Sequence, residues 1–164
     1  METLKEQLEA AYESFGDQFY RCALAVTACG SLAEDAVHNA FAKAMRLPQS
    51  PQDIKAYMFR SIRNAAIDLM RKQQRIVPMT AEMIFEIGPD QQSHLDRLEQ
   101  LEQITHGLAK LSTDERETIV QHLVAHLTFQ EIANVRERPL PTITSWYRRG
   151  LKKLKQHLHH EGSL

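Results

Sequence analysis

The sequence predicts an all-α protein with two small helical domains joined by a flexible linker. Apolar residues recur every three or four positions along most of the chain, which is the period of an α-helix, and no segment alternates as a half-buried strand would. Of the 164 residues, 43% are hydrophobic and 25% are charged, so a folded chain is expected. The period is lost over residues 76–91, where prolines and a glycine cluster, and this segment is the predicted linker between domains at 1–75 and 92–164.

Three helices are predicted in the first domain. The first carries an apolar stripe from Leu4 and ends near Gly30, and Gly16 is expected to weaken or kink it. Ser31 and Glu34 have the spacing of a capping box, so the second helix is expected to open there and to end at two prolines. The third is expected to follow with Asp53 as its cap and to extend into a basic tail.

The second domain is predicted to begin with a helix over residues 95–108. Ser112 and Glu115 form a second capping-box pattern, which opens a helix with apolar positions as far as Leu127. A short helix over residues 128–135 and a basic helix that starts at Pro141 follow.

The net charge of −1 conceals a segregation of charge. Residues 60–75 hold five basic side chains and one acid, and residues 136–155 hold seven basic side chains and one acid, whereas residues 82–102 hold six acids and one arginine. Two basic patches on either side of an acidic connector suggest two contact surfaces for a polyanion. The alternative is that basic helix ends complement the helix dipole.

The last two predicted helices have the pattern of a helix-turn-helix. Ile143, Tyr147 and Leu151 give the basic helix a buried stripe, and its remaining faces carry threonine, serine and basic side chains. A recognition helix of this kind presents short polar side chains to base edges and cations to phosphates. The turn carries Glu137 where a glycine is usual.

Three segments resemble the extracytoplasmic-function sigma factors of bacterial RNA polymerase. The segment "LSTDERETIVQHLVAHLTFQEIANVRERPLPTITSWYRRGLKKLK" resembles their fourth conserved region, and "AEDAVHNAFAKAM" and "IKAYMFRSIRNAAIDLMRKQQR" resemble parts of the second. The resemblance covers nearly the whole chain in the expected order. It implies a dissociable polymerase subunit that selects promoters, with RNA polymerase core enzyme and promoter DNA as partners, and an anti-sigma factor as a further expected partner.

The resemblance also implies site residues. Binding to the core enzyme falls on Asp35, His38, Asn39 and Phe41. Binding to the −10 promoter element falls on Arg60, Arg63, Asn64, Arg71, Lys72 and Arg75. Binding to the −35 element falls on Thr142, Thr144, Ser145, Arg148, Arg149 and Lys152. The chain departs from the family pattern at His38 and Asn39, which replace an amide and a carboxylate, and in the short loop over residues 47–53.

Two other functions remain open from the sequence. One is a sigma-like decoy that binds a regulator but no promoter, and the other is a stand-alone helix-turn-helix regulator, which would form a homodimer on a palindromic site. Enzyme motifs are absent, and neither a cofactor nor a metal site is expected, because His122 and His126 have helical spacing but no evident third ligand. No segment has the roughly 18–20 apolar residues of a membrane helix, so a cytoplasmic protein with Cys22 and Cys29 reduced and buried is expected.

Overall fold

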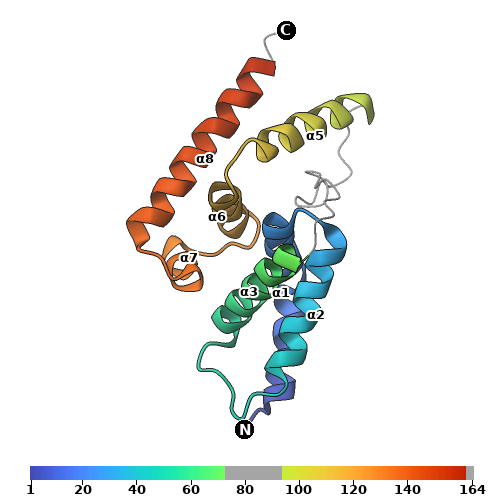
Figure 1. Ribbon diagram of the computed structural model, residues 1–164, viewed down its shortest axis with the longest axis vertical. Coiled ribbons are helices and arrows are strands. Elements are labelled where there is room, and N and C mark those ends of the chain that lie inside the picture. Colours follow the sequence, from blue (N-terminus) through green and yellow to red (C-terminus); the bar gives the residue numbers. More distant parts are fainter. Residues whose placement is uncertain (73–93, 162–164) are drawn as a thin grey trace.

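The computed structural model describes residues 1–72 and 94–161, and every regular element in these ranges is an α-helix. The predicted linker at 76–91 and Arg75 lie outside the described residues. The first lobe contains α1 (Leu4–Thr27), α2 (Gly30–Ala44) and α3 (Ile54–Lys72). The second contains α5 (His94–Ala109), α6 (Thr113–Leu123), α7 (Phe129–Arg136) and α8 (Leu140–Glu161). The predicted all-α class is confirmed (Figure 1).

The first lobe packs around Phe19 of α1, which is fully buried. Its ring meets Phe59 of α3 at 4.7 Å and Phe41 of α2 at 5.9 Å between centroids. Alanines at every third or fourth position of α2 are buried on the facing side and let the three helices approach closely. Gly16 does not interrupt α1, which is continuous from Leu4 to Thr27.

Capping explains most of the helix starts. Ser112 and Glu115 form the predicted capping box at α6, and Asp53 accepts a hydrogen bond from the backbone of Ala56 at the start of α3. The capping box predicted at Ser31 and Glu34 is wrong. Ala28 takes a left-handed conformation that ends α1, so the chain turns at Cys29 and α2 begins at Gly30, before Ser31.

The helix predicted as far as Leu127 ends four residues earlier, at Leu123. His126 has a φ of 58°, so His122 and His126 do not share a helix face. Instead, the ring of His122 stacks on Phe129 at 4.2 Å, and its Nδ1 lies 2.8 Å from the Leu127 carbonyl oxygen. No group of three potential metal-ligating His, Cys, Asp or Glu side chains occurs in the described ranges.

The turn between α7 and α8 has the geometry of a helix-turn-helix. Glu137 ends α7 in the left-handed region, with a φ of 52°, at the position where glycine is favoured. Leu140 then begins α8, and Ile143 is fully buried against the second lobe. Gly150 allows α8 to approach α6 closely, because a Cβ there would lie 2.9 Å from Ile119 Cδ1.

The two lobes pack against each other, which the sequence does not predict. Helix α1 contacts α6, and α3 contacts α7, so α6 and α7 lie between α8 and the first lobe (Figure 1). Buried apolar side chains of both lobes form one continuous cluster. Cys22 and Cys29 are both buried, as predicted. None of the helices in the described ranges is long and apolar enough to cross a membrane.

Candidate polymerase and nucleic-acid interfaces

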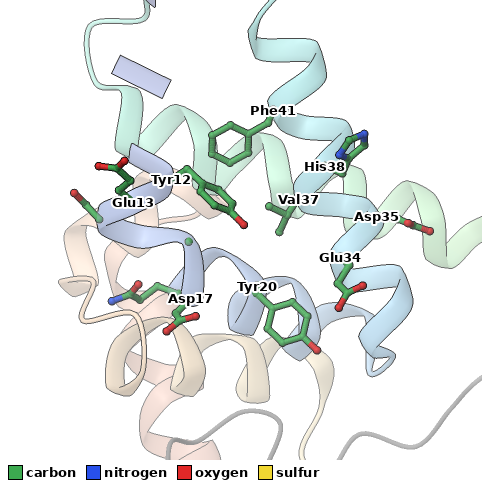
Figure 2. Close-up of a pocket in the computed structure, with 12 residues that line it drawn as sticks. Tyr12, Glu13, Asp17, Tyr20, Glu34, Asp35, Val37, His38 and Phe41 are labelled. Carbon is green, nitrogen blue, oxygen red and sulfur yellow. The ribbon is translucent and has the colours of Figure 1, made fainter. Parts of the chain in front are cut away.

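A groove between α1 and α2 gathers most of the residues predicted to bind the polymerase. It has a volume of about 1140 Å³, and Asp35, His38 and Phe41 line it (Figure 2). Asn39 does not line this groove. It faces a smaller cavity between α2 and α3. The structure therefore brings together three residues of the predicted set and separates the fourth.

The opposite wall of the groove belongs to α1. Tyr12 is 58% exposed and meets the Phe41 ring edge-on at 5.5 Å, while Glu13 and Asp17 extend the wall (Figure 2). Glu34 adds a further carboxylate from α2. An apolar floor between acidic walls suits the apolar and basic faces of an amphipathic helix.

The cavity that contains Asn39 also holds two residues of the predicted −10 set. Asn64 and Lys72 line it from α3, and its volume is about 230 Å³. The amides of Asn39 and Asn64 can each donate and accept hydrogen bonds, and Lys43 adds a second cation. One residue of the polymerase set and two of the DNA set thus share a polar cavity.

Two other residues of the predicted −10 set face the second lobe. Arg60 Nη2 donates a 2.8 Å hydrogen bond to the Asn134 carbonyl oxygen. Arg63 donates through Nε to the Glu117 carboxylate, and its Nη2 lies 3.5 Å from the other carboxylate oxygen. Arg71 and Lys72 are exposed at the end of α3. The structure therefore divides the predicted −10 set between an exposed part and a part covered by α6 and α7.

Three residues of the predicted −35 set form one row on α8. Thr142, Ser145 and Arg149 follow each other at spacings of three and four, so they lie on the same helix face, which we call the outer row. Ser145 and Arg149 are exposed. A helix face with short hydroxyl side chains near its N-terminus and an arginine one turn later fits the major groove of duplex DNA.

The other three residues of the set lie on an adjacent face. Thr144, Arg148 and Lys152 are spaced four apart and line a groove of about 650 Å³ whose apolar part includes Phe129 and Tyr147. The rings of Phe129 and Tyr147 meet at 5.1 Å. The structure therefore places the predicted −35 residues on two neighbouring faces of one helix.

A buried ionic cluster connects α6 to α7. The side chain of Arg136 is 1% exposed, and its Nη2 lies 2.6 Å from Asp114 Oδ1 and 3.2 Å from Glu117 Oε2. Its guanidinium also stacks on the Trp146 ring at 4.8 Å. Burial lowers the pKa of Arg136, and the Glu117 carboxylate opposes that shift. Because Glu117 binds both Arg136 and Arg63, this cluster extends across the contact between the lobes.

A second buried carboxylate ties α8 to α6. Glu115 Oε1 lies 2.7 Å from Lys153 Nζ and also accepts a hydrogen bond from the Ser112 backbone. Burial acts to raise the pKa of Glu115, but the hydrogen bonds from Lys153 and Ser112 outweigh it, so the pKa is lowered overall. Glu115 is therefore ionised near neutral pH and links α8 to α6.

Several of these residues are missing from the sequence-based site. Glu117 and Arg136 carry no motif, although Glu117 lies three residues before Val120 on the buried side of α6. An acid on a buried helix face is a signal for a buried ion pair. Tyr12 fits the apolar period of α1, but it is exposed at the edge of the groove, whereas its neighbour Ala11 is buried.

The fold and these surfaces define an all-helical protein whose second lobe contains a helix-turn-helix and whose first lobe carries basic residues of its own on α3. The family model for Sigma-70 region 2 matches residues 11–76, and the family model for Sigma-70 region 4 matches residues 101–154. The chain belongs to the sigma-70 family, in the extracytoplasmic-function group, whose members direct RNA polymerase to promoters.

Individual relatives agree with this family. The chain is 26% identical over 153 residues to the extracytoplasmic-function sigma factor SigM of Bacillus subtilis, covering 90% of this chain and 94% of SigM. It is 27% identical over 126 residues to the sigma factor RpoE of Cereibacter sphaeroides, covering 77% of this chain and 70% of RpoE.

Two solved structures share the fold. The sigma factor RpoE in complex with the anti-sigma factor NepR from Bartonella quintana gives a TM-score of 0.66 at 22% identity, and covers 94% of this chain and 96% of RpoE. CnrH in complex with the cytosolic domain of CnrY gives a TM-score of 0.68 at 21% identity, and covers 95% of this chain and 90% of CnrH.

Proposed function

We propose that this sigma factor contacts its partners through three surfaces. The groove between α1 and α2 binds the core enzyme, the exposed end of α3 with the cavity at Asn64 binds the −10 element, and α8 binds the −35 element. The domains extend over residues 1–75 and 92–164. The observation that carries the proposal is the outer row of α8, presented by a helix-turn-helix.

The acidic groove accounts for binding to the polymerase despite the departure at His38 and Asn39. These two residues supply no carboxylate, but Glu13 and Asp17 on α1 line the same groove. Acids on both walls attract a basic helix, and Tyr12 with Phe41 provides the apolar contact. The residues on α1 therefore belong to the core-binding surface together with Asp35, His38 and Phe41.

Selection of the −35 element falls on the outer row. Ser145 contacts base edges, where it can donate or accept a hydrogen bond, and Arg149 contacts phosphate. The exposed cations of α3, Arg71 and Lys72, bind the backbone near the −10 element, and the Asn39–Asn64 cavity receives unstacked DNA. Each surface is small, so the polymerase supplies affinity by fixing the distance between the lobes.

The protein acts in the cytoplasm, where it meets the polymerase, and catalyses no reaction itself. An anti-sigma factor controls it. The two solved structures named above support this part of the proposal, because one holds RpoE with the anti-sigma factor NepR and the other holds CnrH with the cytosolic domain of CnrY.

Run-off transcription tests the proposal. Core enzyme is combined with the purified chain, bound protein is recovered by pull-down, and transcripts made from a genomic DNA library are sequenced. A shared upstream motif among the transcripts is expected. Recovery of the chain with core but no transcripts would favour the decoy, and a homodimer that binds a palindrome without core would favour the stand-alone regulator.

Two variants separate the roles on α8. Arg149→Ala is expected to weaken promoter binding by core plus this chain on every sequence and to lower the salt dependence by about one ion. Ser145→Ala is expected to change the preferred base at particular −35 positions. Identical selection profiles for the two variants would contradict this assignment.

A further inference from the structure

The first turn of α8 exposes a large apolar side chain at the end of the helix that a helix-turn-helix directs at DNA. Leu140 is the first residue of α8 and is 40% exposed. Among the exposed large apolar side chains of residues 1–72 and 94–161, it is the one that lies on α8. The N-terminal residues of such a helix are those that reach base edges. Leu140 therefore has the place of a base-reading residue, but its side chain has no hydrogen-bonding group.

The backbone around Leu140 is fixed although its side chain is exposed. Pro139 and Pro141 restrict φ on either side of it. The Pro139 carbonyl oxygen accepts hydrogen bonds from the backbone N–H groups of Thr142 at 3.0 Å and Ile143 at 3.3 Å, which closes the first turn. Ile143 is fully buried and anchors this turn in the second lobe. Binding through this turn costs little backbone entropy, because the backbone is already ordered.

Leu140 begins a ridge of side chains along α8. It is followed at spacings of four by Thr144, Arg148 and Lys152, so these residues form one row on the helix surface. The Thr144 hydroxyl donates a 3.1 Å hydrogen bond to the Pro141 carbonyl oxygen, so its hydrogen is not available to a base. Arg148 and Lys152 are exposed. The ridge therefore combines an apolar side chain at its start with two cations further along.

This combination matches one feature of the major groove. Thymine is the base that presents a methyl group there, and apolar side chains bind that methyl group by direct contact. Cations such as Arg148 and Lys152 bind phosphates, which position the protein but carry no sequence information. On the outer row, by contrast, Ser145 offers a hydroxyl that donates or accepts a hydrogen bond. The two faces of α8 can therefore read different groups of one DNA element.

We propose that Leu140 selects thymine in the −35 element by packing against its 5-methyl group, while Arg148 and Lys152 bind the neighbouring phosphates. This inference rests on the proposed function, because it assumes that α8 binds the −35 element. It adds a position at which the base is chosen by apolar contact and not by a hydrogen bond.

The test compares thymine with deoxyuridine, which lacks only the methyl group. The −35 motif is first selected from a randomised duplex library with core enzyme and the full chain. Deoxyuridine then replaces thymine at each thymine of the motif in turn, on either strand, and competition assays measure binding by core plus chain. For the wild type we expect one thymine at which loss of the methyl group weakens binding about fourfold.

The variant Leu140→Ala identifies the side chain that senses the methyl group. It is expected to bind thymine and deoxyuridine equally at that position, and to keep the salt dependence of the wild type because no charge is lost. Any effect of the methyl group on the DNA itself is common to both proteins and cancels in the comparison. Leu140→Met preserves an apolar side chain and is expected to retain most of the discrimination.

The matched control is Leu123→Ala, which removes the same side chain from a 44% exposed position on α6. It is expected to retain the fourfold discrimination. Circular dichroism verifies that each variant is folded, which we expect because both leucines are exposed.

Equal weakening by deoxyuridine for the wild type and Leu140→Ala would overturn the proposal, and so would a motif in which no thymine is sensitive to its methyl group. In either case the selected motif would still support the proposed function. Failure of core plus chain to select any −35 motif would instead reject the assignment of α8 to the −35 element, and this inference with it.

Discussion

The buried Arg136 cluster makes a quantitative prediction about stability. Arg136→Met keeps most of the side-chain volume and removes the guanidinium. It deletes the 2.6 Å and 3.2 Å contacts with Asp114 and Glu117, a 3.1 Å hydrogen bond to Thr118 Oγ1 and the stacking on Trp146. The cluster also joins α7 to α6, so its loss weakens the support of the helix-turn-helix.

The expected cost follows from the exposure of the partners. Removing one member of a buried ion pair typically costs about 3–5 kcal/mol, because a charge is left buried and uncompensated. The Asp114 side chain is 50% exposed, so water takes over its solvation, whereas the Glu117 side chain is 1% exposed. Arg63 still compensates Glu117. We therefore expect Arg136→Met to lower the free energy of unfolding by about 3 kcal/mol, the lower end of that range. The total free energy of unfolding of a domain is typically about 5–15 kcal/mol.

Urea unfolding at pH 7, followed by circular dichroism, measures the free energy of unfolding and the slope m. Arg138→Met is the control, because Arg138 is exposed and its replacement is expected to cost less than about 0.5 kcal/mol. The double variant Arg136→Met/Glu117→Leu removes both charges, and its cost is expected to be smaller than the sum of the single costs. A loss below about 1 kcal/mol for Arg136→Met, with m unchanged, would refute this reasoning.

Three further predictions concern single positions. Glu137→Gly relieves a left-handed backbone and is expected to raise the free energy of unfolding by up to about 1 kcal/mol in urea titrations; a loss would show that the Glu137 side chain matters more than the backbone. The folded-state pKa of Glu115 lies below its ordinary value of 4.5, so its stabilising effect is fully present above about pH 4.5 and is lost as the pH falls through the folded-state pKa. The stability difference between wild type and Lys153→Met, measured by urea unfolding between pH 7 and pH 3, is expected to shrink on acidification. Gly150→Val places a branched side chain at a position where even a single Cβ would lie 2.9 Å from Ile119 Cδ1, so it is expected to cost about 2 kcal/mol or more in thermal unfolding. Gly150→Ala is expected to cost less, because its clash is smaller and alanine has the higher helix propensity.

Local features of the fold were predictable because their causes are local. The capping box at Ser112 needs only a partner three residues away, and so does the cap at Asp53. The Ser31–Glu34 pattern gave a wrong helix start because it, too, is only a local pattern. A left-handed turn at Ala28 restarted the helix before the serine could cap it, and nothing in the local pattern distinguishes the two outcomes.

Contacts between the lobes were not predictable from one sequence. Arg63 and Glu117 are 54 positions apart, and the sequence offers many other pairs of opposite charge. The charge segregation correctly identified α3 and α8 as the basic helices, but it could not show that part of α3 faces carboxylates of the other lobe. The groove on α1 was missed because Tyr12 fits the apolar period of a core-facing stripe.

Two of the hydrogen bonds between the lobes end on main-chain carbonyl oxygens, those of Ala25 and Asn134. Every amino acid has this acceptor, so mutation at either position preserves it. Correlated substitutions among homologues would therefore report only the side-chain pairs, such as Lys55 with Glu131, and would underestimate how firmly the halves of this molecule are joined. Substitution at the exposed Asn134 therefore retains its anchor, whereas substitution at the fully buried Ala25 is limited by core packing and not by the hydrogen bond.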